Sequence, residues 1–274
     1  MSRKCALAVA GLVRVITLPI VKWNRVSTLA QASERLVPRV KVRTRRGELL
    51  FYTPSKTAIH WPRHGFAAEP QTLEWIDTIG GGDVLWDVGA NVGAYALFAA
   101  KIPGISVLAF EPNPFTFHTL VKNISLNRLE DSIKAFCLAF SDATKIDDLY
   151  LPNIDAGTVR NVFGKDSFSR GRPLDQGARI AVPGMSIDRF CEVFEPPLAT
   201  HMKIDVDNIE DRIVSGGIRA LSRPELRSVL IEMDNEGDEQ KTKIYHLMTE
   251  AGLAPAERHP LTNPRFFNQL FERR

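Results

Sequence analysis

The stretch that most constrains the fold runs from Val84 to Gly93 and reads VLWDVGANVG. Its first five residues are mostly apolar and lie between glycine-rich segments, which is typical of a central parallel strand buried on both faces. Asp87 comes near the end of this strand, where open α/β sheets bind their ligands. Apolar residues recur at helical spacing after Asn91. The stretch therefore predicts a strand, a glycine turn and a helix whose N-terminus points at a ligand.

The chain after Gly93 continues to alternate strands with helices. Apolar runs predict further strands at residues 105–110, 133–140, 146–151 (an edge strand), 179–182, 201–206, 226–233 and 266–271. Amphipathic patterns predict helices at residues 70–79, 113–127, 186–194, 208–221 and 241–251. This alternation predicts a mostly parallel sheet with helices on both faces. Residues 152–178 are rich in Gly, Pro, Asp and Arg and predict a long irregular insertion.

Three regions are expected along the chain. Residues 1–36 form a basic, partly helical N-terminal arm, and residues 37–82 contain a β-hairpin, a loop and a short helix that lead into the main domain. Residues 83–274 form that domain. The hairpin is predicted by the alternating residues from Val40 to Tyr52, on both sides of a turn. Three cysteines without paired spacing argue against a disulfide framework and predict a reduced, cytoplasmic protein.

The N-terminal arm carries most of the positive charge. Residues 1–46 hold eleven Lys or Arg and one acidic residue, whereas the remainder holds 24 Lys or Arg and 31 acidic residues. Such an arm can meet nucleic acid, anionic lipid or an acidic partner, or it can be a solvated leader. Arg14 interrupts the apolar run, which is too short to span a membrane. Residues 4–23 could instead form a basic amphipathic helix that makes peripheral contact with a membrane.

Acidic residues gather where the predicted strands end. Glu111 follows the second strand, 24 positions after Asp87, and can accept hydrogen bonds from a ribose diol. The turn lacks the GxGxxG pattern, so nothing marks a pyrophosphate. A nucleoside with a charged amino acid tail fits better, with Ser141 or Asp142 at the adenine edge. The candidate cofactor-binding residues are Asp87, Gly89, Asn91, Gly93, Glu111, Asn113, Ser141 and Asp142.

Six motifs follow one another along the chain: DVGANVG (87–93), AFEPNP (109–114), LVKNISLN (120–127), SIDRF (186–190), KIDVD (203–207) and LIEM (230–233). In this order they resemble the FkbM family of S-adenosylmethionine-dependent methyltransferases. The resemblance covers about residues 84–255. It implies a class I, Rossmann-like α/β fold with a seven-stranded sheet, here extended by the basic helix and the hairpin. It also implies S-adenosylmethionine as cofactor and methylation of a hydroxyl, often on a sugar or natural product. Asn208-Ile209 departs from the family, which often has a glycine there.

Lys203 and Asp205 are the candidate catalytic residues. Strand alternation sends both to the same side, and only Asp205 lies at the strand end. Asp205 is therefore predicted to be the base that removes the acceptor proton, or a metal ligand. Lys203 is predicted to support Asp205, and His201 to be an ordinary strand residue.

A metal site is a further hypothesis. Asp205 with Asp234 and Asn235 resembles the Mg²⁺ ligands of catechol-type O-methyltransferases, and oxygen ligands suit this cation. The alternative is that Asp234 and Asn235 cap a helix that begins near Gly237.

Two other functions remain open from the sequence. In the helix predicted at residues 113–127, Asn-Pro (113–114) followed by Leu-Asn (126–127) also resembles tRNA guanine-N1 methyltransferases. The basic arm could then bind the phosphates of RNA. Against this, the strand predicted at residues 201–206 ends in DVDN (205–208) rather than in the Asn-Pro-Pro-aromatic motif. The other alternative is a non-catalytic module that binds the cofactor or a partner. Residues 53–68, which include Trp61, and 152–178 are expected to cover the acceptor.

Overall fold

The computed structural model describes residues 8–9, 11–12, 22–164, 167–168, 172–173 and 177–273. The chain divides into two compact units, Met1–Pro38 and Arg39–Arg274. The first contains helix α2 (Lys22–Leu36). Most of the surface helix predicted at residues 4–23 lies outside the described residues. None of the helices in the described ranges is long and apolar enough to cross a membrane.

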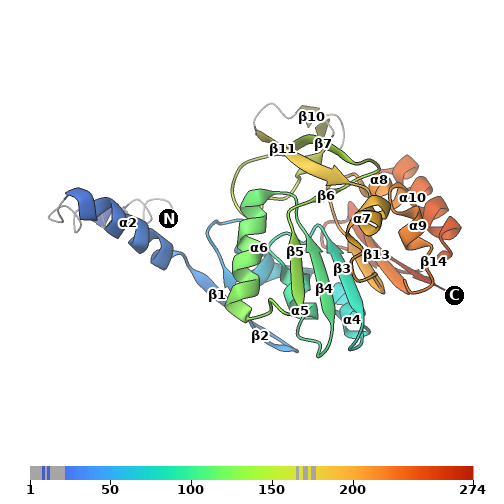
Figure 1. Cartoon of the computed structure of the whole chain (residues 1–274), viewed down its shortest axis with the longest axis horizontal. Helices are drawn as coiled ribbons and strands as arrows, with labels where there is room; N and C mark the ends of the chain where they lie inside the picture. Colours follow the sequence, from blue (N-terminus) through green and yellow to red (C-terminus); the bar gives the residue numbers. More distant parts are fainter. Residues whose placement is uncertain are drawn as a thin grey trace. The chain divides into compact units, whose positions relative to one another are not determined.

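Within the described residues of the second unit, a central sheet has seven strands in the order β14-β15-β13-β12-β3-β4-β5 (Figure 1). They are β3 (Val84–Val88), β4 (Ser106–Phe110), β5 (Ile133–Phe136), β12 (His201–Ile204), β13 (Ser228–Asp234), β14 (Leu253–Pro260) and β15 (Phe266–Arg273). The strands from β13 to β5 run parallel, and β15 is antiparallel to both of its neighbours. This order confirms the predicted class I fold. It also places β3 at the point where the strand order reverses, which is where such sheets bind ligands.

The predicted strand at residues 133–140 was wrong in its extent. Its first half is β5, whereas β6 (Ala139–Phe140) pairs in a separate sheet whose described members run in the order β6-β11-β7-β8. The other three are β7 (Lys145–Leu151), β8 (Val162–Phe163) and β11 (Ala178–Met185). The segment predicted as an edge strand of the main sheet is therefore β7 of this second sheet. The predicted irregular insertion contains β8 and the short strands β9 (Ser167–Phe168) and β10 (Arg172–Pro173).

Helices cover both faces of the central sheet (Figure 1). One face packs on α4 (Pro70–Asp77), α5 (Ala94–Ala99) and α6 (Pro114–Asn127), and the other on α7 (Ile187–Phe194), α8 (Glu210–Ser215), α9 (Ile218–Leu221) and α10 (Asp238–Glu250). The single helix predicted at residues 208–221 is interrupted at Gly216-Gly217, between α8 and α9. A side chain on Gly216 would come within 2.2 Å of the Ser141 carbonyl oxygen, so the close packing there requires glycine.

The hairpin forms as predicted, from β1 (Arg39–Thr44) and β2 (Gly47–Tyr52), with Val40 opposite Phe51. Asparagine side chains of α6 form hydrogen bonds with backbone groups of β2. Asn127 accepts a hydrogen bond from the Leu50 amide (2.9 Å) and donates one to the Leu50 carbonyl (2.7 Å). The following segment, predicted as a loop, contains the π-helical turn η1 (Trp61–Gly65) and α3 (Phe66–Ala68). The hairpin thus belongs to the same compact unit as the sheet.

Candidate cofactor and acceptor site

A cavity of about 330 Å³ opens at the carboxyl ends of β3, β4, β12 and β13. This volume is within the range of small-molecule sites. Its walls are formed by Trp61, Gly89, Ala90, Asn91, Val92, Ala94, Tyr95, Glu111, Pro112, Val159, Arg160, Asn161, Lys203, Asp205, Val206, Asp207, Glu232, Asn263 and Phe266. Of the predicted site residues, it brings together Gly89, Asn91, Glu111, Lys203 and Asp205.

The glycine turn after β3 folds back tightly on the segment after β12. Gly89 has a φ of +87°, and a Cβ there would lie 1.9 Å from the carbonyl oxygen of Asp205. Only glycine fits both the backbone conformation and this contact. Asn91 also has a positive φ (50°), as does Gly93 (87°). The turn therefore brings backbone, rather than side chains, to one wall of the cavity.

Glu111 is buried between two backbone amides. Its carboxylate accepts hydrogen bonds from the amides of Asn91 (3.0 Å) and Asn113 (2.8 Å), one on each oxygen. Burial raises its pKa to about 7, against the opposing effect of these two amides. Each carboxylate oxygen can accept one more hydrogen bond. Glu111 can therefore bind two neighbouring hydroxyl groups, as the ribose hypothesis requires.

Asp87 lies beneath the turn and is 1% exposed. Neither of its carboxylate oxygens makes a hydrogen bond of normal geometry with a described residue, although the backbone amide of Ala96 lies close enough to favour the ionised form. Burial raises the pKa of Asp87 to about 6, which Lys203 opposes and Asp205 reinforces. A buried carboxylate without a firm partner is typical of a functional site.

The other predicted cofactor residues lie outside the cavity wall. Asn113 caps α6, and its Oδ1 accepts a hydrogen bond from the Phe115 amide (3.1 Å). The Ser141 hydroxyl donates to Asp142, which forms an ion pair with Arg212 (2.9 Å). Both follow β6 of the second sheet, so they do not end a strand of the central sheet as expected. The residues just before them, 138–140, line a small apolar void of about 30 Å³ beside Gly89.

Lys203 lies among carboxylates at the base of the cavity. Its ammonium group donates to Asp205 and lies 4.8 Å from the centre of the Tyr95 ring. Burial alone would lower the pKa of Lys203, but Asp205, Glu69 and Asp87 outweigh burial and raise it. Lys203 therefore stays cationic and cannot act as a base. The side chain of Asp205 is 22% exposed and reaches the cavity.

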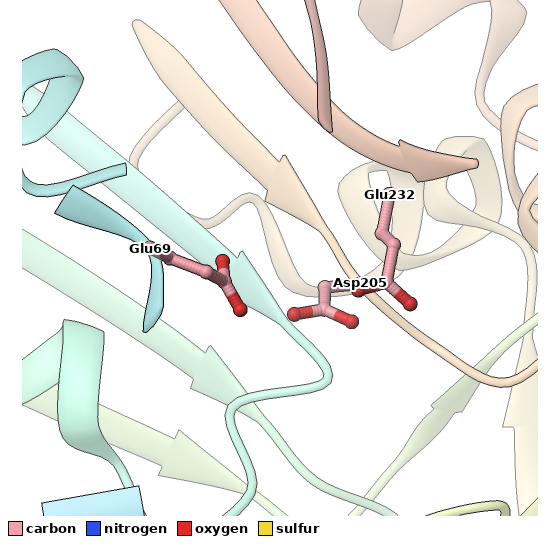
Figure 2. Close-up of side chains that lie close together, drawn as sticks. All are labelled: Glu69, Asp205 and Glu232. Atoms are coloured by element: carbon pink, nitrogen blue, oxygen red, sulfur yellow. The ribbon is translucent and has the colours of Figure 1, made fainter. Parts of the chain in front are cut away.

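Two further carboxylates complete this cluster (Figure 2). Glu69 precedes α4, and Glu232 lies near the end of β13; with Asp205 they offer oxygen atoms that all lie within 4.8 Å of one another. Burial raises the pKa of both glutamates, and the neighbouring Asp205 adds to this effect. Glu232 lies in the motif LIEM (230–233), and sequence reasoning gave it no role of its own. Glu69, which comes from a separate segment, carried no signal.

Two of the predicted magnesium ligands, Asp234 and Asn235, have other partners and do not line the cavity that Asp205 reaches. Asp234 forms an ion pair with Arg265, whose Nε lies 2.9 Å from the carboxylate. Asn235 accepts from Arg258 and donates to the Pro264 carbonyl oxygen (2.7 Å). These partners come from the end of β14 and the turn that follows it, a strand the sequence did not predict. The structure therefore does not support the proposed Mg²⁺ site of Asp205, Asp234 and Asn235.

Two segments cover the cavity, in the regions expected to cover the acceptor. Trp61 comes from η1, and Val159, Arg160 and Asn161 come from the insertion. Asp207 fixes the second segment, because its half-buried carboxylate accepts a hydrogen bond from the Asn161 amide (2.8 Å). Burial, and then Asp205, raise the pKa of Asp207 to about 7.

Asn208 occupies the position where the family often has a glycine, and it adopts a glycine-like backbone conformation. Its φ of 68° lies in the left-handed region that favours glycine. Asparagine tolerates this region better than other residues with a side chain. The loop that follows Asp205 and Asp207 therefore keeps a backbone conformation that a glycine would readily adopt.

The chain is similar in sequence to known methyltransferases. A family model described as methyltransferase FkbM domain matches residues 87–253. The 31-O-demethyl-FK506 methyltransferase FkbM of Streptomyces tacrolimicus is 25% identical over 232 residues, which cover 77% of this chain and 84% of that protein. The hexuronic acid methyltransferase AglP of Haloferax volcanii is 27% identical over 172 residues, covering 63% of this chain and 64% of that protein.

Among solved structures, methyltransferase FkbM from Methylobacillus flagellatus is 16% identical, with a TM-score of 0.47, and the match covers 69% of this chain and 43% of that one. The family assignment rests on the matched domain, which takes up more than half of the chain. The chain belongs to the FkbM family of S-adenosylmethionine-dependent methyltransferases.

Proposed function

We propose that this enzyme is an O-methyltransferase that acts on a hydroxyl of a sugar, a glycan or another small molecule. The observation that carries the proposal is that one cavity is lined by both groups of residues. Glu111 and the glycine turn form one wall of it, and Asp205 and Lys203 form its floor. The names of two relatives describe a hexuronic acid and a demethylated natural product as methyl acceptors, which supports a hydroxyl-bearing acceptor.

The residues of the cavity fit S-adenosylmethionine. Glu111 has capacity for the two ribose hydroxyls, and Gly89 and Asn91 line the same cavity, where the amino acid tail would lie. Asp87, buried without a firm partner, adds negative charge near the site of a cationic cofactor. When bound, S-adenosylmethionine supplies a methyl group that is already activated for transfer. The protein's remaining tasks are to align the acceptor oxygen and to take up its proton.

Asp205 is the proposed base. It reaches the cavity, and Lys203 holds one of its carboxylate oxygens in place, which leaves the other oxygen free to accept a hydrogen bond from an acceptor hydroxyl. Asp205 would take up the proton of the acceptor hydroxyl when bound S-adenosylmethionine gives its methyl group to that oxygen and leaves as S-adenosylhomocysteine. Because Lys203 remains cationic, its role in this proposal is to position Asp205 and to balance the charge of the cluster.

The test measures S-adenosylhomocysteine formation with a panel of glycosides and hydroxylated natural products. We expect Asp205→Asn to lower kcat by about 10²- to 10⁴-fold, as for loss of a general base, while binding of S-adenosylhomocysteine stays within a few-fold of wild type. Glu250→Gln, on the exposed face of α10, serves as the charge-matched control. Methylation of RNA, with no turnover of any hydroxylated small molecule, would reject the proposal.

A further inference from the structure

We propose that Glu232 is an acceptor-binding residue, and that Asp205 and Glu232 together select acceptors with two neighbouring hydroxyls, a vicinal diol. This inference rests on the proposed O-methyltransferase function. It adds a specificity residue and a narrower class of substrate to that function.

The sheet register places the two carboxylates side by side. β12 and β13 are parallel neighbours, and Ile204 lies opposite Ile231. Asp205 follows Ile204, and Glu232 follows Ile231, so these two residues also lie next to each other. Figure 2 shows the two side chains converging from these adjacent segments, with Glu69 approaching from the other side.

The three carboxylates of Glu69, Asp205 and Glu232 differ in the hydrogen bonds that they already accept within the protein. Glu69 accepts hydrogen bonds from the side chains of Thr72 (3.1 Å) and Asn268 (3.0 Å) and does not line the cavity. Asp205 uses one oxygen for Lys203. Glu232 lines the cavity, and none of the hydrogen bonds found among the described residues involves its carboxylate. Glu232 is therefore the member of the cluster that is most open to a ligand.

An unpartnered hydroxyl points to a polar ligand at the same place. Tyr95 lines the cavity and is only 7% exposed. Its hydroxyl lies near Glu69 but makes no hydrogen bond of normal geometry within the described part of the chain. A buried hydroxyl of this kind normally has a partner. A bound hydroxyl group of the acceptor would supply one.

The rest of the wall suits a ring with hydroxyls on its edge. Trp61 and Phe266 are the large aromatic side chains of the wall besides Tyr95, and Asn263 adds an amide. Pockets that combine aromatic walls with a few placed polar groups orient small ligands. Two neighbouring ring hydroxyls lie about one hydrogen-bond length apart, so one can donate to Asp205 while the other donates to Glu232. The first is the oxygen that is methylated.

The test compares matched acceptors. The probes are methyl glycosides with a vicinal diol and their monodeoxy analogues, which lack one of the two hydroxyls. Wild type should prefer the diol by at least tenfold in kcat/KM over the analogue that lacks the hydroxyl facing Glu232, because that analogue leaves the half-buried Glu232 carboxylate without a donor. Glu232→Gln should reduce this preference to less than about threefold, mainly by lowering activity on the diol.

Glu69→Gln is the matched control, since it makes the same charge change in the same cluster away from the cavity wall. It should change activity on both probes by the same factor. Equal turnover of diol and deoxy probes by wild type would overturn the inference and leave the proposed function intact, whereas turnover of neither probe class would count against both. Loss of activity in EDTA that Mg²⁺ restores would also overturn it, because the two carboxylates would then hold a metal.

Discussion

At the scale of single residues, Glu111 offers the most direct test of the cofactor site. Its ionised carboxylate can accept from two ribose hydroxyls in addition to two backbone amides. We expect Glu111→Gln to weaken S-adenosylhomocysteine binding by about 10- to 100-fold, since hydrogen bonds to a charged group are lost. Because burial raises the pKa of Glu111 to about 7, wild-type affinity should increase from pH 6 to pH 8 as the carboxylate ionises.

Isothermal titration at the two pH values measures both effects. Asp142→Asn, in an ion pair outside the cavity, is the control and should leave the affinity near that of wild type. An affinity for Glu111→Gln equal to that of wild type at pH 8 would show that the ribose is bound elsewhere.

Glu210 predicts how stability depends on pH. It is 5% exposed, and burial, reinforced by Asp207 and Asp205, raises its pKa from 4.5 to about 8. Between these values the folded protein keeps a proton that the unfolded chain releases. The free energy of unfolding contributed by Glu210 is therefore fully present below about pH 4.5 and falls as the pH rises toward 8.

Glu210→Gln mimics the protonated form and keeps an acceptor for Gln240, which donates to Glu210 over 2.9 Å. Thermal unfolding should show that the variant has a higher Tm than wild type at pH 8 and nearly the same Tm at pH 5. The expected rise is about 2–4 °C for each kcal/mol gained in the free energy of unfolding. Glu250→Gln should match wild type at both pH values. A variant that is less stable than wild type at pH 8 would mean that the Glu210 carboxylate is ionised and satisfied.

Sequence reasoning predicted some residues of the candidate site and missed others for a physical reason. Asp87, Glu111 and Asp205 follow apolar runs, and the ends of parallel strands must meet at one edge of a sheet. Glu69 precedes a helix outside that pattern, and only the folded chain brings it to Asp205. Asp142 was expected at the cavity because residues 133–140 look like one continuous strand; the chain leaves the central sheet before it.

At the scale of elements, the glycine turn depends on one close contact. Gly89→Ala adds a methyl group that would lie 1.9 Å from the Asp205 carbonyl oxygen, so the turn and the segment after β12 must separate. We expect a loss of about 3 kcal/mol or more in the free energy of unfolding, together with at least a tenfold loss of cofactor affinity.

Gly82 provides a matched control for this substitution. It has nearly the same backbone conformation, with a φ of +88°, but a Cβ there meets no atom within 4 Å. Gly82→Ala should therefore cost only the strain of the left-handed conformation, about 1–2 kcal/mol, and should leave cofactor affinity unchanged. Urea unfolding and titration with S-adenosylhomocysteine measure the two quantities. Equal effects of the two substitutions would assign the loss to backbone strain alone.

Elements were predictable where the apolar pattern was continuous and uninterrupted. The central parallel strands and α6 show such patterns. β14 was missed because its residues, LAPAERHP, contain two prolines and three charged or ionisable side chains in a row, which suits only an edge strand. β14 is in fact one of the two edge strands of the central sheet.

At the scale of the whole molecule, charge and exposed apolar surface coincide in the first unit. Residues 1–38 hold six Lys or Arg and one acidic residue. Large apolar side chains that are more than half exposed among its described residues are Val9, Leu12, Val26 and Leu36. Basic residues with exposed apolar side chains on helical segments favour binding to an anionic membrane surface. We therefore propose that this unit makes peripheral contact with membranes, and that the second unit, Arg39–Arg274, which contains the cavity and is called the catalytic unit below, is not needed for this contact.

Removing residues 1–38 tests this division of roles. The full chain should co-sediment with phosphatidylglycerol vesicles and be released by high salt, because each basic residue near such a surface contributes about 1 kcal/mol and salt screens the attraction. The chain 39–274 should not co-sediment, and its affinity for S-adenosylhomocysteine should stay within about twofold of the full chain, since the cavity residues all lie in the second unit. Neutral phosphatidylcholine vesicles are the control. Equal binding of both chains to anionic vesicles would place the membrane contact on the catalytic unit, whereas salt-sensitive binding of the full chain to RNA but not to vesicles would assign the arm to nucleic acid.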